Sequence, residues 1–227
     1  TRKALARRYL GILEELVHRR PLPPASNPAP SFEGVRDLMN RGTALALLLL
    51  LSPLLLVLAA AVGGTLGFPL LFRQDRLGFQ GRVFGLVKFR TMRTGEGNDR
   101  ERLTPLGRFL RATSLDELPE LWNVVRGDMR LVGPRPLLVQ YRDRYTAAQF
   151  RRHEVPPGIT GWAQINGRNA LSWEQKFALD VWYVDHASWA LDVRILLRTF
   201  ASVLLRQGIT APGEATMPEF LGSGKRA

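Results

Sequence analysis

The most conspicuous feature of the hydrophobic pattern is one long stretch without charge. Residues 42–72 hold no charged side chain, and residues 44–62 are almost wholly apolar, interrupted only by Ser52 and Pro53. At about 1.5 Å of rise per residue, the nineteen residues of the apolar run extend about 28 Å as a helix, close to the hydrocarbon thickness of a bilayer. A buried core helix is the alternative, but the length of the run favours a membrane segment.

Two features of this run favour a re-entrant helix over a straight span. Pro53 lacks an N–H and its ring clashes with a carbonyl one turn back, which predicts a kink, while Ser52 can donate to a carbonyl freed there. Basic residues flank the run on both sides, eight in residues 1–41 and ten in residues 73–111, so the positive-inside bias places both flanks in the cytoplasm. A hairpin that enters and leaves by one leaflet satisfies both observations, and an ordinary Pro-kinked span is the alternative.

The remaining pattern predicts an α/β fold that is mostly helical. In chain order we expect an amphipathic helix over 4–20, a Pro-rich linker over 21–30, a strand over 83–92, a polar loop over 94–102, helices over 106–111 and 115–125, an irregular functional loop over 155–169, and helices over 172–184 and 191–206. The apolar stripe of the last helix suits a core face and a membrane interface equally well.

These elements predict three parts of the chain. Residues 1–30 form an N-terminal helix and linker, residues 31–72 the re-entrant membrane helix, and residues 73–227 a compact cytoplasmic catalytic domain with amphipathic interfacial helices and a small strand element. The chain opens with Thr1 and shows no signal-peptide pattern, so we expect it to begin inside a longer chain or after processing.

Charge and composition exclude several classes of function. The 227 residues include 32 Lys and Arg against 20 Asp and Glu, a formal net charge of +12, and no Cys. The lack of Cys excludes a disulfide scaffold, a Cys-ligated metal and a thiol nucleophile, and the three His residues are not at metal-ligand spacing. The excess positive charge favours an anionic partner, which could be a nucleic acid, a membrane surface or a phosphate-rich substrate.

The run over residues 112–123 carries the densest chemistry. Asp116, Glu117 and Glu120 follow shortly after Arg111. This arrangement suits phosphoryl transfer, in which an Asp can attack phosphorus and a neighbouring Glu can bind Mg²⁺. The pattern Ser-x-x-Glu from Ser114 to Glu117 is also a capping box, and Asp116 could itself be an N-cap, so the local pattern alone favours capping.

Basic residues form two further clusters. Arg135 lies between Pro134 and Pro136, which restrict the backbone and lower the entropic cost of presenting its guanidinium to a diphosphate. A surface turn is the alternative. Lys88 and Arg90 are two positions apart on the predicted strand, so they face one side and could bind phosphate, although a solvated strand face is the commoner arrangement.

Several motifs then follow one another in a recognisable order. They are the charge-free helix with Ser52-Pro53, FRQDRLGFQGRVFGLVKFRTM (72–92), RATSLDELPELWNVVRGDMRLVGPRPLL (111–138), HEVPPGITGWAQINGRN (153–169) and LDVRILLRTFASVLLRQGITAPG (191–213). Together they resemble the bacterial sugar transferases that initiate glycoconjugate assembly, the monotopic polyprenyl-phosphate phosphoglycosyl transferases. The resemblance covers about residues 36–220, and the ordered set is far more specific than any one motif. Residues 63–69 depart from it, since the family often carries Ser-Pro-Gly-Pro there.

The resemblance implies a reaction and a place for it. A phosphosugar passes in two steps, with Mg²⁺, from a UDP-sugar to a polyprenyl (undecaprenyl) phosphate, and UMP is released. The implied location is the cytoplasmic face of the bacterial inner membrane, in contact with membrane lipid, at the first step of exopolysaccharide, O-antigen or glycoprotein glycan assembly.

The resemblance also assigns roles to residues of this chain. Asp116 matches the nucleophile, which forms a covalent Asp-phosphosugar intermediate, and Glu117 matches the neighbouring acid at the metal. This implication outweighs the capping interpretation of Asp116. Lys88 and Arg111 match catalytic residues that handle phosphates and the nucleotide. The substrate-binding matches are Arg90, Arg135, Gln164 and Arg168. Ser52 and Pro53 match the break of the membrane helix.

Two other functions fit parts of the sequence. A membrane-tethered module that binds nucleic acid or anionic lipid without catalysis would use the net charge, but its basic residues are interleaved with Asp116, Glu117 and Asp128, so we expect no nucleic-acid partner. A UDP-sugar glycosyltransferase without a covalent step would release UDP instead of UMP. The sequence names neither the sugar nor the pathway and leaves the oligomeric state open, a homodimer included.

Overall fold

The computed structural model describes residues 30–95, 98–167, 171–204 and 219–222. The chain divides into two compact units, Thr1–Glu33 and Gly34–Ala227, and the described residues lie almost entirely in the second. The helix expected over residues 4–20, nearly all of the Pro-rich linker, and Arg168 lie outside the described residues.

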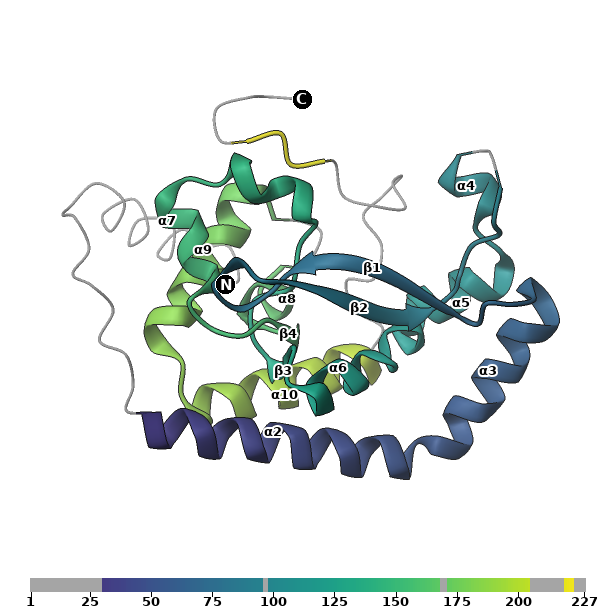
Figure 1. The fold of residues 1–227 in the computed structure, drawn as a ribbon, viewed down its shortest axis with the longest axis horizontal. Coiled ribbons are helices and arrows are strands. Elements are labelled where there is room, and N and C mark those ends of the chain that lie inside the picture. Colours follow the sequence, from purple (N-terminus) through teal and green to yellow (C-terminus); the bar gives the residue numbers. More distant parts are fainter. Residues whose placement is uncertain (1–29, 96–97, 168–170, 205–218, 223–227) are drawn as a thin grey trace. The chain divides into compact units, whose positions relative to one another are not determined.

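Two helices that meet at a sharp bend take up the apolar run (Figure 1). Helix α2 covers Pro30–Leu50 and α3 covers Ser52–Leu66, with a bend of 65° between them. Pro53 lies in the first turn of α3, where an N–H has no helical partner to lose, and Ser52 Oγ donates to the carbonyl oxygen of Leu49 at 2.7 Å. The predicted break at Ser52 and Pro53 is confirmed.

The bent pair has one packed end and one apolar exposed region. None of the described helices is by itself long and apolar enough to cross a membrane, whereas Gly34–Leu50 and Ser52–Leu66 pass that test together as a bent pair. Arg36 and Asn40, in the first half of α2, are buried in the protein, while Leu50 near the bend is 74% exposed. Helix α2 thus begins well before the apolar run, because its first half packs against the rest of the chain.

An antiparallel hairpin follows the bent pair. Strand β1 (Leu71–Leu77) pairs with β2 (Val83–Phe89) along its whole length, and a 3-10 turn, η1 (Phe79–Gly81), lies between them. The strand predicted over 83–92 is confirmed up to Phe89, but its partner β1 was not predicted. The sequence of β1, LFRQDRL, lacks apolar alternation because most of its side chains are exposed.

Short helices and turns carry the chain from the hairpin to the acidic run. They are α4 (Asp99–Arg102), α5 (Pro105–Thr113), η2 (Leu115–Glu117) and α6 (Glu120–Arg126). The helix expected over 106–111 is confirmed. The single helix expected over 115–125 is wrong, since the chain forms the 3-10 turn η2 and then α6, with Pro119 at the junction. The end of the predicted loop 94–102 is the helical turn α4.

A second, two-stranded sheet lies beyond α6. Strand β3 (Arg130–Val132) pairs in parallel with β4 (Gly158–Thr160), and α8 (Trp162–Ile165) follows β4 at once. The prediction of an irregular loop over 155–169 is therefore wrong for its centre. Glycine serves here for close packing of backbones, because a Cβ on Gly158 would lie 2.0 Å from the backbone nitrogen of Gly133. Between the strands lie η3 (Val139–Arg144), α7 (Ala147–Phe150) and η4 (Arg151–His153).

Two longer helices complete the described fold. Helix α9 (Trp173–His186) begins with Ser172 in a capping box with Gln175, and α10 covers Trp189–Leu204, so the helices expected over 172–184 and 191–206 are confirmed within the described residues. The last helix has a core face, since Ile195 is fully buried, while Leu197 and Phe200 are each 66% exposed. Contact of that exposed side with a membrane interface stays a prediction.

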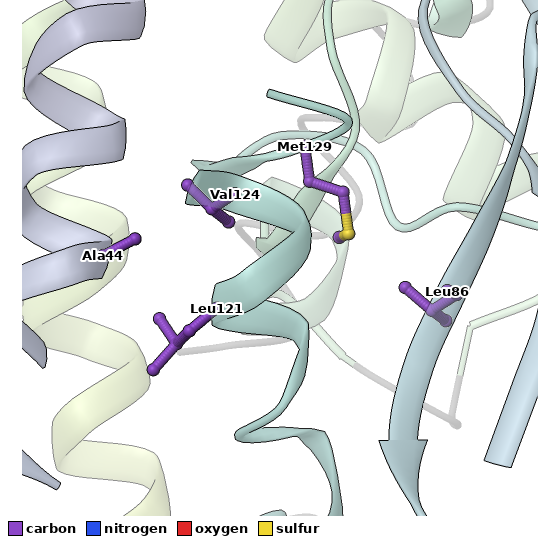
Figure 2. Packing of buried hydrophobic residues seen from close by; sticks show 5 residues of the cluster. All are labelled: Ala44, Leu86, Leu121, Val124 and Met129. Carbon is purple, nitrogen blue, oxygen red and sulfur yellow. The ribbon is translucent and has the colours of Figure 1, made fainter. Parts of the chain in front are cut away.

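The core fixes the bent pair to the sheets. Figure 2 shows Ala44 of α2, Leu121 and Val124 of α6, Met129 and Leu86 of β2 in one buried cluster, in which α6 lies between α2 and the hairpin. A buried polar group ties α2 to the two long C-terminal helices. Arg36 Nη2 lies 2.5 Å from Asp192 Oδ2 of α10 and donates to the hydroxyl of Tyr183 of α9 at 2.9 Å. These contacts set where the bend lies relative to the acidic run.

Candidate active site

The acidic residues lie on the 3-10 turn η2, directly after α5. Helix α5 ends at Ser114, which has a left-handed backbone (φ 58°) and whose side chain makes no capping bond to η2. The capping-box interpretation of Ser114 and Glu117 is therefore wrong. A left-handed residue turns the chain sharply, so that Asp116 becomes buried, with 7% of its surface exposed, next to Glu117.

Glu117 lies between two cations from distant parts of the chain. Lys88 Nζ, on β2, donates to Glu117 Oε1 at 2.8 Å, and the guanidinium of Arg135 donates to both oxygens of Glu117. Lys88 Nζ also lies 3.0 Å from Glu120 Oε1 on α6. The structure thus brings together the predicted residues Lys88, Glu117 and Arg135, and it adds Glu120, which the sequence placed in the same acidic run without a role.

The charges around Glu117 divide the acids into two kinds. Burial alone would raise the pKa of Glu117, but the charges of Arg135 and Lys88 outweigh it and hold that pKa well below its usual range. Burial, and then the negative charge of Glu117, raises the pKa of Glu120 to about 7. The same two causes raise the pKa of Asp116 above its ordinary value. The cations around Glu117 therefore favour its ionised form, whereas Asp116 beside it is a buried, more basic carboxylate.

Asn123 holds the acidic run against the hairpin. Its Oδ1 accepts from the backbone N–H of Val87 at 3.1 Å, and its Nδ2 donates to the carbonyl oxygen of Gly85 at 2.8 Å. Asn123 is fully buried on α6, so this side chain satisfies backbone groups at the edge of β2. It sets α6 in register with Lys88, a role with no signal in the local sequence.

The backbone around Arg135 is held by other arginines. Arg152 Nη2 donates to the carbonyl oxygen of Arg135 at 2.7 Å, and the Arg152 guanidinium forms a buried ion pair with Asp180 of α9 at 2.7 Å. Arg76 Nη1 donates to the carbonyl oxygen of Pro136 at 3.4 Å. The prolines around Arg135 are thus only part of its positioning, because three residues that the sequence did not single out complete it.

Two other predicted basic residues have different surroundings. Arg111 Nε donates to Thr91 Oγ1 at 3.0 Å, and Arg111 lines the cavity described below. Arg90 is buried and its guanidinium donates to the carbonyl oxygens of Leu66, Gly67 and Phe68, just past the end of α3. Its contacts therefore give Arg90 an anchoring role for α3, while a contact between Arg90 and substrate stays a prediction.

A cavity of about 660 Å³ opens beside Glu117 and Arg135. Its polar lining includes both of these residues together with Arg111, Gln164, Lys176 and Asp180. Its apolar lining comes from α2 at the bend, from α6 and its approach, from the second sheet and from α10, and includes Leu47, Leu51, Leu118, Leu121, Leu131, Ile159, Leu196 and Phe200. The predicted residue Gln164 thus lines the same cavity as Glu117, and charged and apolar side chains both contribute to the lining.

The acids fit a magnesium ion that is shared with a substrate. Among the described residues there is no group of three or more His, Cys, Asp or Glu placed to bind a metal ion. Mg²⁺ does not need one, because it usually keeps several waters and takes one or two carboxylates together with substrate phosphates. The charge of Glu117 contributes to the raised pKa of Asp116, and a divalent cation beside these two carboxyls would relieve that repulsion.

Comparison with known proteins gives one family and several close relatives. Residues 32–206 match the bacterial sugar transferase family. The chain is 51% identical over 196 residues to the uncharacterized sugar transferase EpsL of Bacillus subtilis (strain 168), which takes in 84% of this chain and 97% of that protein. It is 41% identical over 169 residues to the UDP-glucose:undecaprenyl-phosphate glucose-1-phosphate transferase of Klebsiella pneumoniae. It is 38% identical over 188 residues to the UDP-galactose-lipid carrier transferase of Erwinia amylovora.

The last two relatives are much longer proteins. Their alignments take in 67% and 73% of this chain, but only 36% and 39% of the relatives themselves. The chain therefore spans well under half the length of these two transferases, whereas it covers nearly all of the Bacillus protein.

Proposed function

Because the chain belongs to the bacterial sugar transferase family and is a phosphoglycosyl transferase, we propose that it moves a sugar 1-phosphate from a UDP-sugar to a polyprenyl phosphate and releases UMP. The name of the Klebsiella relative supports undecaprenyl phosphate as the acceptor. Two relatives of similar identity are named for glucose and for galactose, so overall similarity does not set the sugar. As an enzyme, the chain is not the non-catalytic binding module considered above.

One observation carries this proposal. The buried carboxylate of Asp116 lies beside Glu117, which is held between Lys88 and Arg135 at the wall of a cavity whose lining includes both cationic and apolar side chains. Lys88 and Arg135 converge on Glu117, and such a pair of cations suits a diphosphate, while the apolar part of the lining suits a lipid chain. Phosphoryl transfer demands mainly positioning and charge neutralisation, which this arrangement supplies.

The proposed first step forms a bond between an Asp116 carboxylate oxygen and the phosphorus that bears the sugar. The bond from that phosphorus to the oxygen shared with UMP breaks, and UMP leaves with the electron pair. Burial makes the Asp116 carboxylate more basic, which favours nucleophilic attack. Arg135 is positioned to balance the charge that develops on the departing phosphate.

In the proposed second step the phosphate of the lipid attacks the same phosphorus. A new phosphorus–oxygen bond to the lipid forms, the bond to Asp116 breaks, and the carboxylate is restored. A covalent intermediate lets the two anionic substrates occupy the site in turn, so Lys88 and Arg135 can serve both.

We propose that Glu117 binds Mg²⁺ together with the diphosphate. Arg135 and Lys88 lower the pKa of Glu117, which favours the ionised carboxylate that Mg²⁺ takes as an oxygen ligand. When bound, the ion would neutralise phosphate charge and orient the diphosphate. Lys88 and Arg135 then keep Glu117 in place.

The bent pair suggests how the enzyme meets its lipid substrate. Leu49, Leu50 and Leu56 are 67%, 74% and 71% exposed near the bend, and Leu197 and Phe200 of α10 are exposed as well. We propose that these surfaces enter the cytoplasmic leaflet of the inner membrane and that α2 and α3 return to the same side. The apolar wall of the cavity, which includes Leu51 and Phe200, would then receive the first part of the prenyl chain.

The experiment that tests this function follows both products. The full chain, reconstituted in vesicles with undecaprenyl phosphate and Mg²⁺, is incubated with UDP-glucose or UDP-galactose labelled in the sugar. We expect label in the lipid fraction and UMP in the aqueous fraction in equal amounts. Release of UDP would contradict the proposal and favour a glycosyltransferase without a covalent step. Mass spectrometry of the enzyme quenched without lipid acceptor should find the phosphosugar on Asp116.

A further inference from the structure

One part of the cavity wall is built by α8 and α9. Gln164 of α8 lines it, together with Trp173, Lys176 and Phe177 of α9. The sequence alone predicts substrate binding for Gln164 without a specific partner, and it predicts no role for Lys176. This wall is therefore the part of the cavity whose ligand the mechanism leaves unassigned.

Gln164 lacks the partners that a buried amide requires. Both its Oε1 and its Nε2 are shielded from solvent, and neither has a hydrogen-bond partner among the described residues. A buried donor and acceptor without partners carry a desolvation penalty, so such a side chain in a cavity wall indicates a ligand that supplies both bonds. A carboxamide offers one acceptor and one donor side by side in a plane. Its complement is a flat group with an N–H next to a carbonyl oxygen, such as the imide edge of uracil.

Lys176 adds positive charge to the same wall. Burial, and then the charge of Arg135, lowers the pKa of Lys176, so the two cations lie within electrostatic reach of each other. An anion received between the two side chains would relieve their repulsion. The ring of Trp173, which is partly exposed and stacks on the buried Phe177 with centroids 5.6 Å apart, adds flat apolar surface to this wall, which suits a planar base.

We propose that this wall is the nucleotide subsite of the donor, in which Gln164 pairs with the imide edge of uracil and Lys176, with Arg135, binds the phosphate that leaves in UMP. The inference rests on the proposed function, since that function makes UMP the leaving group. It assigns this end of the cavity to the nucleotide and leaves the acidic end, at Glu117, to the reacting phosphorus.

The uracil contact can be tested by binding alone. Equilibrium dialysis of the full chain in nanodiscs measures the affinity for UMP and for UMP methylated at N3, which cannot donate to Gln164. We expect the wild-type enzyme to bind UMP about tenfold more tightly than the methylated analogue, since one well-made hydrogen bond to a buried group is worth roughly that factor. In Gln164→Ala, which removes the amide and leaves room for the methyl group, the ratio should fall close to one.

Control variants separate this contact from a loss of folding. Gln140→Met changes an exposed glutamine on η3 and should keep the wild-type ratio. Gln164→Met preserves the size of the side chain. It should lower the affinity for UMP without changing the thermal midpoint by more than a few degrees. A wild-type ratio in Gln164→Ala would overturn the base contact. The base contact would also be overturned if Gln164→Ala changed only the ratio of the KM values for UDP-glucose and UDP-galactose, because that result places Gln164 at the sugar.

The phosphate contact is tested with uridine as the comparison ligand. Lys176→Met should lower the affinity for UMP about tenfold and leave that for uridine unchanged, whereas Lys176→Arg should retain most of the UMP affinity. Equal losses for both ligands would contradict a phosphate contact. If the wild-type enzyme binds neither UMP nor uridine, the proposed function itself fails, which is distinguishable from failure of the subsite alone.

Discussion

Lys88 Nζ lies 2.8 Å from Glu117 Oε1, so a strand of the hairpin holds the residue next to the candidate nucleophile. The same ammonium contacts Glu120, and its three donors can serve both acids at once. Lys88→Met should lower kcat by at least about a hundredfold, because both buried carboxylates lose a counter-charge and Glu117 shifts toward Arg135 alone. Turnover with labelled UDP-sugar measures the effect. Lys88→Arg should recover part of the rate, and near-normal turnover in Lys88→Met would contradict the assigned role.

Asp116→Asn should leave a folded enzyme without transfer activity. The amide has the size of the carboxyl group but is a very weak nucleophile, so the rate should drop by about a thousandfold or more. Since burial raises the pKa of Asp116, its ionised form opposes folding, and the variant should be at least as stable as the wild-type enzyme. Asp75→Asn, at an exposed position of β1, is the matched control and should remain active. Substantial sugar transfer by Asp116→Asn would remove Asp116 as the nucleophile.

Glu120 should make the enzyme less stable at alkaline pH. Its pKa is about 7 in the folded chain, above the ordinary value of 4.5. The folded state therefore binds the proton more tightly, and stability falls as pH rises from 4.5 through 7. Glu117 acts in the opposite sense: its lowered pKa stabilises the folded chain above pH 4.5, and this contribution is lost as pH falls further.

Glu120→Gln isolates the contribution of Glu120. The amide can still accept from Lys88 but does not ionise, so the thermal midpoint should match the wild-type value at pH 5 and exceed it by several degrees at pH 8, a difference on the order of 2 kcal/mol. Differential scanning calorimetry in detergent measures both. A variant that is less stable than the wild type at pH 8 would show that the ionised Glu120 stabilises the fold.

The sequence singled out the acidic run, Lys88 and Arg135, because each carries a local signal of charge or of flanking proline, and the structure brings these residues into contact. It also predicted the bend, since Pro53 interrupts an otherwise uniform helix. It did not find Asn123, Arg152 or Asp180, whose roles depend on partners 17 to 38 positions away in the chain. The glycines near Gly158 predict a loop from sequence alone, because glycine is typical of turns and also of places where two backbones pack closely, as they do here.

Arg152 and Asp180 should stabilise the enzyme through the loop that carries Arg135. Arg152→Met leaves a buried carboxylate without its partner, which costs about 3–5 kcal/mol, and it frees the carbonyl oxygen of Arg135. The thermal midpoint should fall by roughly 10 °C, and KM for the UDP-sugar should rise in the fraction that stays folded. The double variant Arg152→Met, Asp180→Leu should recover part of the midpoint but not the KM. Recovery of both would show that the pair does not position Arg135.

The topology of the bent pair can be tested with single cysteines, since the chain has none of its own. Gly34, in the first turns of α2, and Thr94, beyond the hairpin, are both exposed in the structure. If α2 and α3 enter and leave by the same leaflet, cysteines at the two positions should react with a membrane-impermeant maleimide from the same side of sealed inverted vesicles. Pro53→Leu removes the steric reason for the bend, so a straight helix becomes accessible, and label at residue 94 should then appear partly from the opposite side. Labelling of Gly34→Cys and Thr94→Cys from opposite sides in the chain that retains Pro53 would establish a crossing helix instead, because a re-entrant pair cannot separate its two flanks.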